Sequence, residues 1–312
     1  MDARMHPLPF NPASLPGLSE KLLQSHHQNN YGGAVKRLNA IRAQLAATPA
    51  ATLSGFALNG LKREELIATN SMLLHELYFA SLGGDGHAMV PALELALTAN
   101  FGSVAAWRDE FMAMGRALGG GSGWVLLSFQ PREGTLVNQW ASDHGHALAD
   151  AVPLLALDMY EHAYHLDHGA AAGAYVDAFM AHIHWAAVYA RYQQAVHAAS
   201  DGFAAGPEQL EGALVLDVRR AGVYAQATTG IPGAQWRDPA AVGVWAGELA
   251  AELPAGQPLV VYCVYGHEVG RATAMRLRAA GLDAHFLQGG IDGWASAGRP
   301  LIDKSLNQGE TS

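Results

Sequence analysis

The stretch "LDMYEHAYHLDHG", residues 157–169, places several ionisable groups beside an apolar run. Asp158 and His162 are four residues apart, a spacing that brings a carboxylate and an imidazole within reach of one metal ion if a helix begins here. Such a pair also occurs by chance on many helix faces, so alone it is weak evidence. We expect the other polar residues of the stretch, His165, Asp167 and His168, to lie at a solvated helix end.

Two more histidines lie in segments with helical periodicity. His26 occurs in "QSHHQNNYGGAVKRLN" and His75 in "NSMLLHELYFASLG". The residues around His75 are mostly apolar, so we expect its imidazole to face inward, where it needs a partner. For either histidine alone, a core residue with a satisfied hydrogen bond is the commoner interpretation.

Cys263 is the one cysteine of the chain, which excludes an internal disulfide and fits a reducing compartment. It ends the apolar run "PLVVYC" and precedes the helical segment "GRATAMRLRAAG". A thiol in that place faces loop amides and the positive end of a helix, which predicts a stabilised, nucleophilic thiolate. The alternative is a buried cysteine that acts as a small hydrophobe. Its position at the carboxyl end of a parallel strand favours a functional role.

The elements that position these residues divide the chain in two. Up to about residue 199 the pattern is helical, interrupted at 119–140 by two apolar runs around "QPREG" that predict a hairpin and a small antiparallel sheet. The rest alternates short buried strands with helices, as parallel α/β folds do. We therefore predict an α+β domain at 1–199, a linker at 200–206, an α/β domain at 207–303 and a polar tail at 304–312.

Composition excludes several classes of protein. The chain has 312 residues and a formal charge of −9, and it carries no basic stripe, so nucleic acid is not an expected partner. No apolar run approaches the roughly 20 residues that cross a bilayer, and the start shows no secretion signal. We expect a cytoplasmic protein without membrane contact.

Three segments of the first half together resemble the iron/manganese superoxide dismutase family, over about residues 8–196. They are "LDMYEHAYHLD", "GGGSGWVLL" and "LHELYFASL", which agree with the family in order and separation. The resemblance implies one Fe or Mn ion per chain, a choice between metals that the sequence leaves open. It implies the four ligands His26, His75, Asp158 and His162, and a redox cycle that converts superoxide to dioxygen and hydrogen peroxide.

The resemblance also implies the surroundings of the metal. Glu161 would reach a ligand of a partner subunit, which implies a homodimer. Aromatic residues would shield the metal from bulk water: Trp124, Tyr160, Tyr164, Trp185 and Trp140.

The sequence departs from the family at two positions, which puts the rate of dismutation in doubt. The glutamine expected four residues before the second histidine ligand is replaced by Ser71. Its other expected place offers His144, with His146 as the alternative, and some members use histidine there. The gateway tyrosine is replaced by Ala34, and Tyr31 could substitute for it through a shifted backbone. If His27 rather than His26 is the first ligand, the count of residues from that ligand to the expected tyrosine changes as well.

Residues 207–303 resemble a rhodanese domain. The matching segments are "LVLDVRRAGVYAQATTGIPGAQW", "VVYCVYGHEVGRAT" and "FLQGGIDGWASAGRPL". The resemblance implies that Cys263 carries a persulfide for sulfur transfer, and that Asp217 and Arg219 tie the loops together. The persulfide loop would be Val264, Tyr265, Gly266, His267, Glu268 and Val269.

The loop also narrows the chemistry. A cysteine phosphatase needs arginine where Val269 stands, so that activity is excluded. The negative charge of Glu268 would repel thiosulfate, which is a dianion. A persulfide is therefore as good a candidate for the sulfur donor as thiosulfate is.

The sequence therefore predicts a superoxide dismutase fused to a sulfurtransferase. The alternative is a redox or sulfur sensor with a slow or vestigial metal site, which the departures at Ser71 and Ala34 motivate. Neither the sulfur donor and acceptor nor any coupling between the two domains can be derived from the residues.

Overall fold

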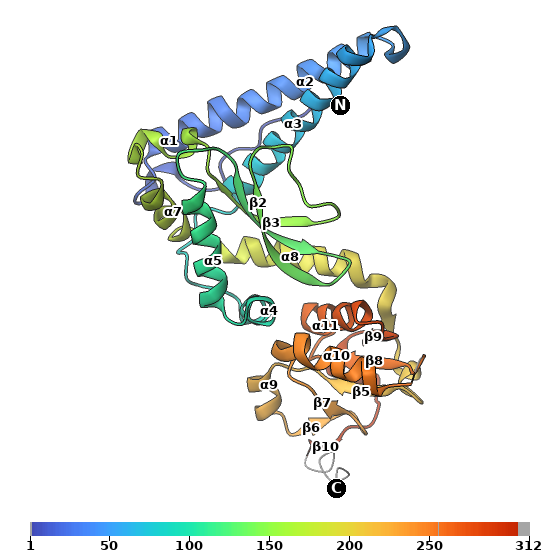
Figure 1. Cartoon of the computed structure of the whole chain (residues 1–312). Helices are drawn as coiled ribbons and strands as arrows, with labels where there is room; N and C mark the ends of the chain where they lie inside the picture. The colour runs from blue at the N-terminus through green and yellow to red at the C-terminus, as the bar shows by residue number, and fades with distance from the viewer. Residues whose placement is uncertain (1, 255, 305–312) are drawn as a thin grey trace. The chain divides into compact units, whose positions relative to one another are not determined.

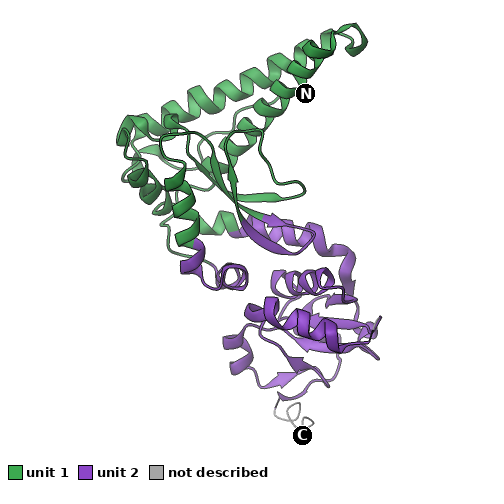
Figure 2. Cartoon of the chain, viewed as in Figure 1, with its two compact units in different colours: residues 1–89, 108–128, 138–188 green, residues 90–107, 129–137, 189–312 purple. Residues whose placement is uncertain are grey.

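The computed structural model describes residues 2–254 and 256–304. Contacts within the chain define two compact units, shown in Figure 2: residues 1–89, 108–128 and 138–188 form one, and residues 90–107, 129–137 and 189–312 form the other. Each unit is described here by itself. The predicted domain limits of 199 and 207 stay a prediction, and the predicted tail lies, from residue 305 on, outside the described residues.

The first unit begins with a long helical hairpin (Figure 1). Its first arm consists of α1 (Glu20–Ser25), a π-helical segment (His26–Tyr31) and α2 (Gly32–Ala47), and its second arm is α3 (Gly55–Ala80). Serines cap both arms: Ser19 Oγ accepts from Leu22 N at 3.1 Å, and Ser54 Oγ accepts from Ala57 N at 3.4 Å. The arms pack through a small cluster of buried residues, Leu38, Ile41 and Ala68.

A three-stranded sheet has the order β2-β1-β3. Its strands are β1 (Trp124–Gln130), β2 (Thr135–Ala141) and β3 (Val152–Asp158). β1 and β2 are joined by a four-residue turn in which Gly134 N donates to Gln130 O at 2.9 Å, so the predicted hairpin is confirmed. The last five residues of β3 are buried, so the segment that follows this strand begins in the interior of the protein.

Shorter helices follow along the chain and are divided between the two units. They are α4 (Pro91–Phe101), α5 (Val104–Ala117), α6 (His165–His168), α7 (Ala172–Met180) and α8 (Trp185–Ser200). In α6, Asp167 accepts hydrogen bonds from the backbone N and the Oγ of Ser19 at 2.6 and 2.7 Å. The end of "LDMYEHAYHLDHG" thus holds the start of α1 in addition to facing solvent, as predicted for it.

The second unit contains a five-stranded sheet of order β4-β9-β8-β5-β7, in which every pair is parallel. Its strands are β4 (Ala204–Ala205), β9 (Ala284–Leu287), β8 (Leu259–Tyr262), β5 (Leu214–Asp217) and β7 (Gln235–Trp236). The helices are α9 (Ala221–Gln226), α10 (Val242–Glu252), α11 (Glu268–Ala279) and α12 (Gly290–Ser296). A short antiparallel pair joins β6 (Thr229–Gly230) to β10 (Ile302–Asp303).

Two separate apolar clusters involve this parallel sheet. Side chains of β8 alternate between them, with Leu259 and Val261 in one cluster and Val260 and Tyr262 in the other. A strand whose successive side chains enter different cores is buried on both faces, which explains the continuous apolar run "PLVVYC".

The predicted fold class is confirmed: a helical hairpin with a small antiparallel sheet, then a parallel α/β domain. One local difference concerns residues 200–206, where β4 pairs with β9 and so extends the sheet. A two-residue edge strand leaves no periodicity to detect in the sequence.

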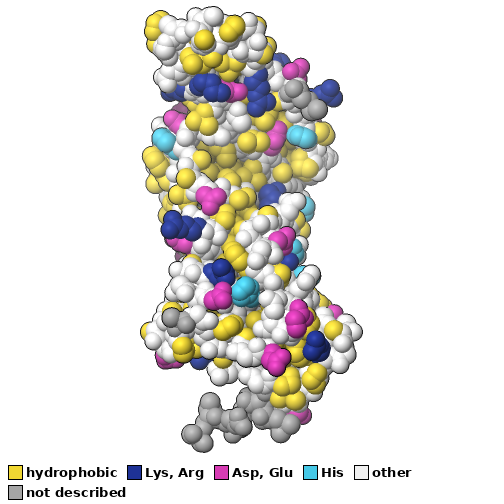
Figure 3. All heavy atoms as spheres, turned by 90° about the vertical axis from the view of Figure 1, so that its right-hand side faces the viewer, with side chains coloured by type: hydrophobic (Ala, Val, Ile, Leu, Met, Phe, Trp, Pro, Cys, Tyr) yellow, Lys and Arg dark blue, Asp and Glu magenta, His cyan; other side chains and the backbone are white. Residues whose placement is uncertain are grey.

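Among the described residues, no helix is both long and apolar enough to span a bilayer. The cytoplasmic location stays a prediction. On the face shown in Figure 3, acidic and basic side chains are interspersed, without a continuous basic area.

The start of β1 depends on a glycine. Gly123 has a φ of +138°, and a Cβ there would lie 2.2 Å from the carbonyl oxygen of Ala141. We expect Gly123→Ala to destabilise the fold by about 2 kcal/mol or more, because it adds a backbone clash to an unfavourable φ. Gly121→Ala is the control, since its Cβ would meet only Leu118 O at 3.4 Å. Calorimetric melting of the full chain measures the effect, and equal melting temperatures for the two variants would contradict it.

Candidate metal centre

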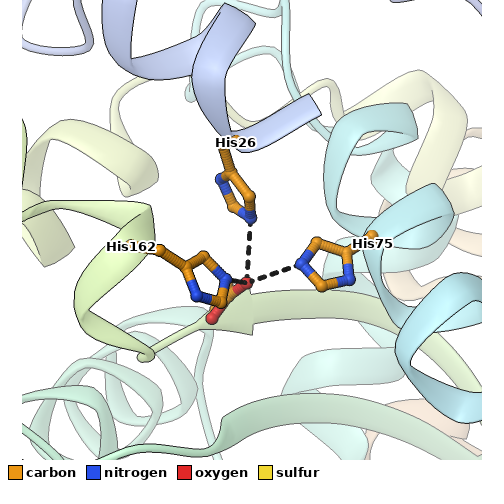
Figure 4. Close-up of side chains that lie close together, drawn as sticks. His26, His75 and His162 are labelled. Atoms are coloured by element: carbon orange, nitrogen blue, oxygen red, sulfur yellow. Dashed lines mark hydrogen bonds and ion pairs between the residues drawn. The ribbon is translucent and has the colours of Figure 1, made fainter. Parts of the chain in front are cut away.

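Asp158 is the last residue of β3, and its carboxylate is fully buried. Three imidazole nitrogens surround its Oδ2 atom: Nε2 of His26 at 3.0 Å, Nε2 of His162 at 3.2 Å and Nε2 of His75 at 3.4 Å. Figure 4 shows the three rings pointing toward this one oxygen. The other oxygen, Oδ1, accepts a hydrogen bond from the backbone N of Tyr160 at 2.9 Å, which fixes the carboxylate.

His26 opens the π-helical segment between α1 and α2. A π segment inserts extra backbone into a helix and is frequent at functional sites. It places the fully buried His26 ring against Tyr78 and Phe79 of the second arm, with ring centres 4.9 and 5.0 Å away. His27, the alternative ligand, turns away, since its Nε2 is 2.8 Å from the carbonyl oxygen of His6. The structure thus brings His26 into the group.

His75 lies in α3, near the carboxyl end of the second arm. Its Nδ1 is 2.6 Å from the carbonyl oxygen of Ser71, a distance at which Nδ1–H donates and the lone pair is left on Nε2. Burial lowers the pKa of His75 to about 3, so the ring is neutral near pH 7. Among the described residues, His75 Nε2 is a buried atom without a hydrogen-bond partner.

His162 reaches the same place from a short 3-10 helix, Glu161–Ala163. The condition stated for this pair, a helix that begins at Asp158, is not met, because Asp158 ends a strand and the chain turns before His162. The four-residue separation still brings both side chains together, since the 3-10 turn folds His162 back over the strand end. The His162 side chain is 27% exposed, the most accessible of the four.

These four residues fit one metal ion. Their ligand atoms all lie within 4.8 Å of one another. A first-row metal binds nitrogen and oxygen at about 2.1 Å, so donor atoms of one coordination shell lie about 3.0 to 3.5 Å apart. The unpartnered Nε2 of His75 is a free donor for such an ion. Imidazole and carboxylate without sulfur suit Fe or Mn.

The carboxylate is ready to bind a cation. Burial by itself would raise the pKa of Asp158, but the charge and hydrogen bond of His162 and the hydrogen bond of His26 outweigh burial and hold this pKa well below its ordinary value. Asp158 is therefore ionised near pH 7.

An aromatic wall stands beside the group. Trp124 Nε1 donates to His144 Nδ1 at 3.0 Å, and the ring of Trp124 meets that of His75 edge-on at 5.3 Å. His144 stacks on Tyr160 at 4.7 Å, and Tyr160 stacks on His162 at 5.4 Å. Since Nδ1 of His144 accepts from Trp124, a neutral His144 carries its proton on Nε2.

His146, the alternative to His144, lies elsewhere. It is exposed, and its Nδ1 is 2.8 Å from Ser142 Oγ. The structure therefore brings His144 into the site and leaves His146 outside it. Trp140, expected to shield the metal, is 54% exposed and stacks on His146, so that expectation is wrong.

The remaining residues of the expected surroundings divide into buried and exposed ones. Tyr164 is buried and stacks on Tyr175 at 5.3 Å, and the Trp185 ring is buried with Nε1 donating to Gly86 O. Glu161 is exposed and thus accessible from outside the chain.

Tyr31 closes the π-helical segment and is buried. Its ring is nearly parallel to that of His75, with centres 6.5 Å apart. The π segment is the kind of backbone shift that a substitution for the tyrosine missing at Ala34 requires. Tyr31 OH donates to Glu76 Oε1 and accepts from His6 N, both at 2.8 Å. Sequence reasoning missed Glu76 and His6, and only the neighbouring position of Glu76 next to His75 could have suggested either.

A cavity of about 310 Å³ lies beside Tyr31. Its lining includes His27, Glu76 and Phe79 from the helical hairpin. A small solute that enters this cavity would lie next to the Tyr31 ring.

A second candidate site lies in the α/β part. Cys263 follows β8 and is 6% exposed. Backbone N–H groups of Tyr265, Gly266, His267 and Gly270 are directed at its thiol. Three of these four belong to the predicted loop, and Gly270 was missed. A Cβ at Gly270 would lie 3.3 Å from Cys263 Sγ, a tight contact that would require the sulfur to shift by a few tenths of an ångström.

The electrostatics at Cys263 differ from the expectation. Burial raises the pKa of the thiol, and the backbone N–H groups offset this only in part. The resting group is therefore a thiol, whereas a stabilised thiolate was predicted. The sequence showed the amides but could not show how deeply the sulfur is buried.

The charged neighbours of Cys263 are held by specific bonds. Arg219 binds both carboxylate oxygens of Asp217, and Tyr262 OH donates to the same carboxylate at 2.9 Å. Glu268, expected to face the sulfur donor, accepts hydrogen bonds from Tyr189 OH at 2.7 Å and Gln193 Nε2 at 3.2 Å. Its carboxylate is thus bound to α8 while it still lines the cavity over Cys263.

Comparisons with known proteins match two different families to the segments that contain the two candidate sites. Residues 89–191 match the model of the iron/manganese superoxide dismutases, C-terminal domain, and residues 197–297 match the Rhodanese-like domain. The chain is 65% identical to Superoxide dismutase (Fe) of Cupriavidus metallidurans over 192 residues, covering 62% of this chain and 97% of that protein. It is 34% identical to Superoxide dismutase (Mn) 1 of Haloferax volcanii, covering 62% and 97%. It is 32% identical to Superoxide dismutase (Fe) of Aquifex pyrophilus, covering 61% and 91%.

The choice between adjacent histidines can be tested directly. We expect His26→Gln to reduce bound metal at least tenfold, because it removes a nitrogen from the shell, and we expect His27→Gln to retain it. Both variants are purified from the same medium, and metal content is measured by mass spectrometry, with circular dichroism as the control for folding. Equal metal content in the two folded variants would contradict the assignment.

Proposed function

Because this chain belongs to the iron/manganese superoxide dismutase family and continues into a rhodanese-like domain, we propose that it is a superoxide dismutase joined to a sulfurtransferase. The observation that carries the first activity is the convergence of His26, His75, Asp158 and His162 on one point. We assign residues 1–199 to the dismutase part, 200–206 to the connection and 207–303 to the sulfurtransferase part.

The dismutase centre holds one Fe or Mn ion. Iron is favoured by the relative with 65% identity, which is named for iron. When bound, such an ion would supply the one-electron redox chemistry by which two superoxide anions and two protons become dioxygen and hydrogen peroxide. The protein supplies three imidazoles and one carboxylate, and a single carboxylate would leave a bound Fe or Mn ion with a net positive charge that attracts the superoxide anion.

The protein's own residues control access and protons. Tyr160 and Trp124 exclude bulk water from the side of His144, and Tyr31 lines the cavity that His27, Glu76 and Phe79 also line. His144 Nε2–H is a donor in the place where the family holds a glutamine or histidine toward the reacting centre. The hydrogen bond from Trp124 to Nδ1 maintains that tautomer.

The dismutase part acts as a homodimer in this proposal. Glu161 follows the strand end and stands next to His162, yet it is exposed in the single chain. A carboxylate in that position can accept a hydrogen bond from a histidine ligand of a second copy. This contact would join two metal centres across the dimer axis.

The rhodanese-like part transfers sulfur through Cys263. The thiol loses its proton to solvent as a donor enters, and its sulfur forms a bond to the outer sulfur of that donor. The donor's S–S bond breaks, sulfite or a thiolate leaves with the electron pair, and the transferred sulfur stays as a persulfide against the backbone N–H groups of the loop. The supporting observation is the set of four N–H groups around one buried sulfur. The donor is thiosulfate or a persulfide.

The dismutase proposal predicts the effect of one exchange. We expect His144→Ala to lower kcat for superoxide about tenfold to a hundredfold with metal content unchanged, because His144 is a proton donor and does not bind the metal. His146→Ala is the matched control and should keep full rates. Stopped-flow decay of superoxide is measured on protein loaded separately with iron and with manganese.

Two results would contradict this proposal. Absence of turnover in both metal forms of the unmodified chain would leave no dismutase. A slow rate that His144→Ala does not change would favour a sensor, the alternative that the replacements at Ser71 and Ala34 suggest.

The sulfurtransferase proposal has a simple readout because Cys263 is the one cysteine. We expect incubation with a sulfur donor to add one sulfur atom to the intact chain, and cyanide to remove it as thiocyanate. Cys263→Ser should abolish both, while its dismutase rate stays unchanged. Intact mass spectrometry measures the addition, and an equal mass gain in Cys263→Ser would refute the role of this thiol.

A further inference from the structure

The cavity over Cys263 is larger and more apolar than a compact inorganic anion requires. Its volume is about 350 Å³, within the range of sites for small organic ligands. Apolar side chains make up much of its lining: Val90, Pro91, Ala92, Val223, Val264 and Val269. Apolar walls of this kind bind the carbon skeleton of a ligand. Thiosulfate has no carbon skeleton.

The charged side chains that line this cavity differ in whether other groups of the protein already bind them. Arg219 is occupied by Asp217 and also donates to the carbonyl oxygen of Thr229 at 2.9 Å. Glu268 is occupied by Tyr189 and Gln193, two neutral groups, so its negative charge remains in the cavity wall. Its charge disfavours a donor with two negative charges.

Arg220 is the exception. It lines the same cavity and is half-buried, and within the described residues its guanidinium makes neither a hydrogen bond nor an ion pair. It follows the occupied Arg219 directly in the sequence, is the N-cap residue of α9, and lines the same cavity without sharing the Asp217 carboxylate. A guanidinium binds a carboxylate through two parallel hydrogen bonds.

From this arrangement we propose that Arg220 holds the acidic group of a small organic persulfide, whose carbon skeleton lies against the apolar wall and whose outer sulfur faces Cys263. The inference rests on the proposed sulfur transfer and adds the class of donor and the residue that selects it. A donor with one carboxylate matches the one uncommitted cation, and its apolar body matches the valines.

The transfer step balances without another reactant. The Cys263 thiol first gives up its proton to solvent as the donor enters. The resulting thiolate forms a bond to the outer sulfur of R–S–SH, and the S–S bond of the donor breaks. The electron pair of that bond leaves with R–S⁻, and Cys263 becomes Cys–S–SH. One sulfur atom moves, and one negative charge is present before and after.

The test compares two donors that differ in one charge: the persulfide of 3-mercaptopropionate and that of its methyl ester. We expect Arg220→Gln in the full chain to raise KM for the acid about tenfold to a hundredfold, the value of a charge-assisted bidentate contact, and to leave the ester unchanged. Arg220→Lys should recover part of the loss. Arg237→Gln is the matched control, because Arg237 is also half-buried but does not line the cavity.

A binding measurement separates this inference from the proposed function. Calorimetric titration of 3-mercaptopropionate into Cys263→Ser protein needs no sulfur transfer, and adding Arg220→Gln should weaken binding about tenfold or more. Unchanged affinity, or equal KM for both donors in Arg220→Gln and Arg237→Gln, overturns the role of Arg220. A higher kcat/KM for thiosulfate than for the acid persulfide overturns the donor class. Failure of the unmodified chain to accept sulfur from any donor, with binding intact, overturns sulfur transfer alone.

Discussion

The dismutase part depends on how the protein compensates one buried charge. Asp158 has no exposed surface, and an ionised carboxylate in such a place costs several kcal/mol unless opposite charge and hydrogen bonds surround it. The described residues offer it three imidazoles and the backbone N–H of Tyr160, and burial keeps His75 neutral near pH 7. A cation at the meeting point of these groups supplies the missing positive charge. The positive charge of the metal therefore accounts for the burial of the Asp158 carboxylate, and the buried carboxylate accounts for the binding of a metal at this point.

Three different kinds of backbone meet at that point. His26 comes from a π-helical segment, His75 from a regular helix, and Asp158 from the end of a strand. The helical hairpin and the strand pack against each other, so the two long elements fix the distance between the histidines and the carboxylate. His162 is placed by local geometry alone, since a short 3-10 turn returns it to the strand end.

The α/β part solves a different problem, which is how to bring backbone amides close to a sulfur atom. Gly270 admits the thiol, and Gly290, at a φ of +59°, allows the neighbouring loop to approach the carbonyl oxygens of Cys263 and Val264. A Cβ at Gly290 would lie 2.5 Å from both carbonyl oxygens and would force the loop apart, whereas a Cβ at Gly270 would only crowd the sulfur, at 3.3 Å. Burial that results from this close packing raises the pKa of the thiol, so reactivity is tied to entry of a donor. Arg220, at the rim of another loop, then supplies charge recognition that the active loop itself lacks.

The sequence by itself determined the two fold classes, the four candidate metal ligands and Cys263, because these follow from periodicity, from residue type and from family motifs with fixed spacing. It also narrowed the residue that could replace the family's glutamine to His144 or His146. Only the tertiary structure decided between them, since two positions along a loop point to different neighbours. The same holds for the choice of His26 over His27, which a π segment sets, and for the link from Tyr31 to Glu76. Burial depth, which reversed the expected shift at Cys263, depends on what packs around a residue from distant segments, and local sequence carries no record of it.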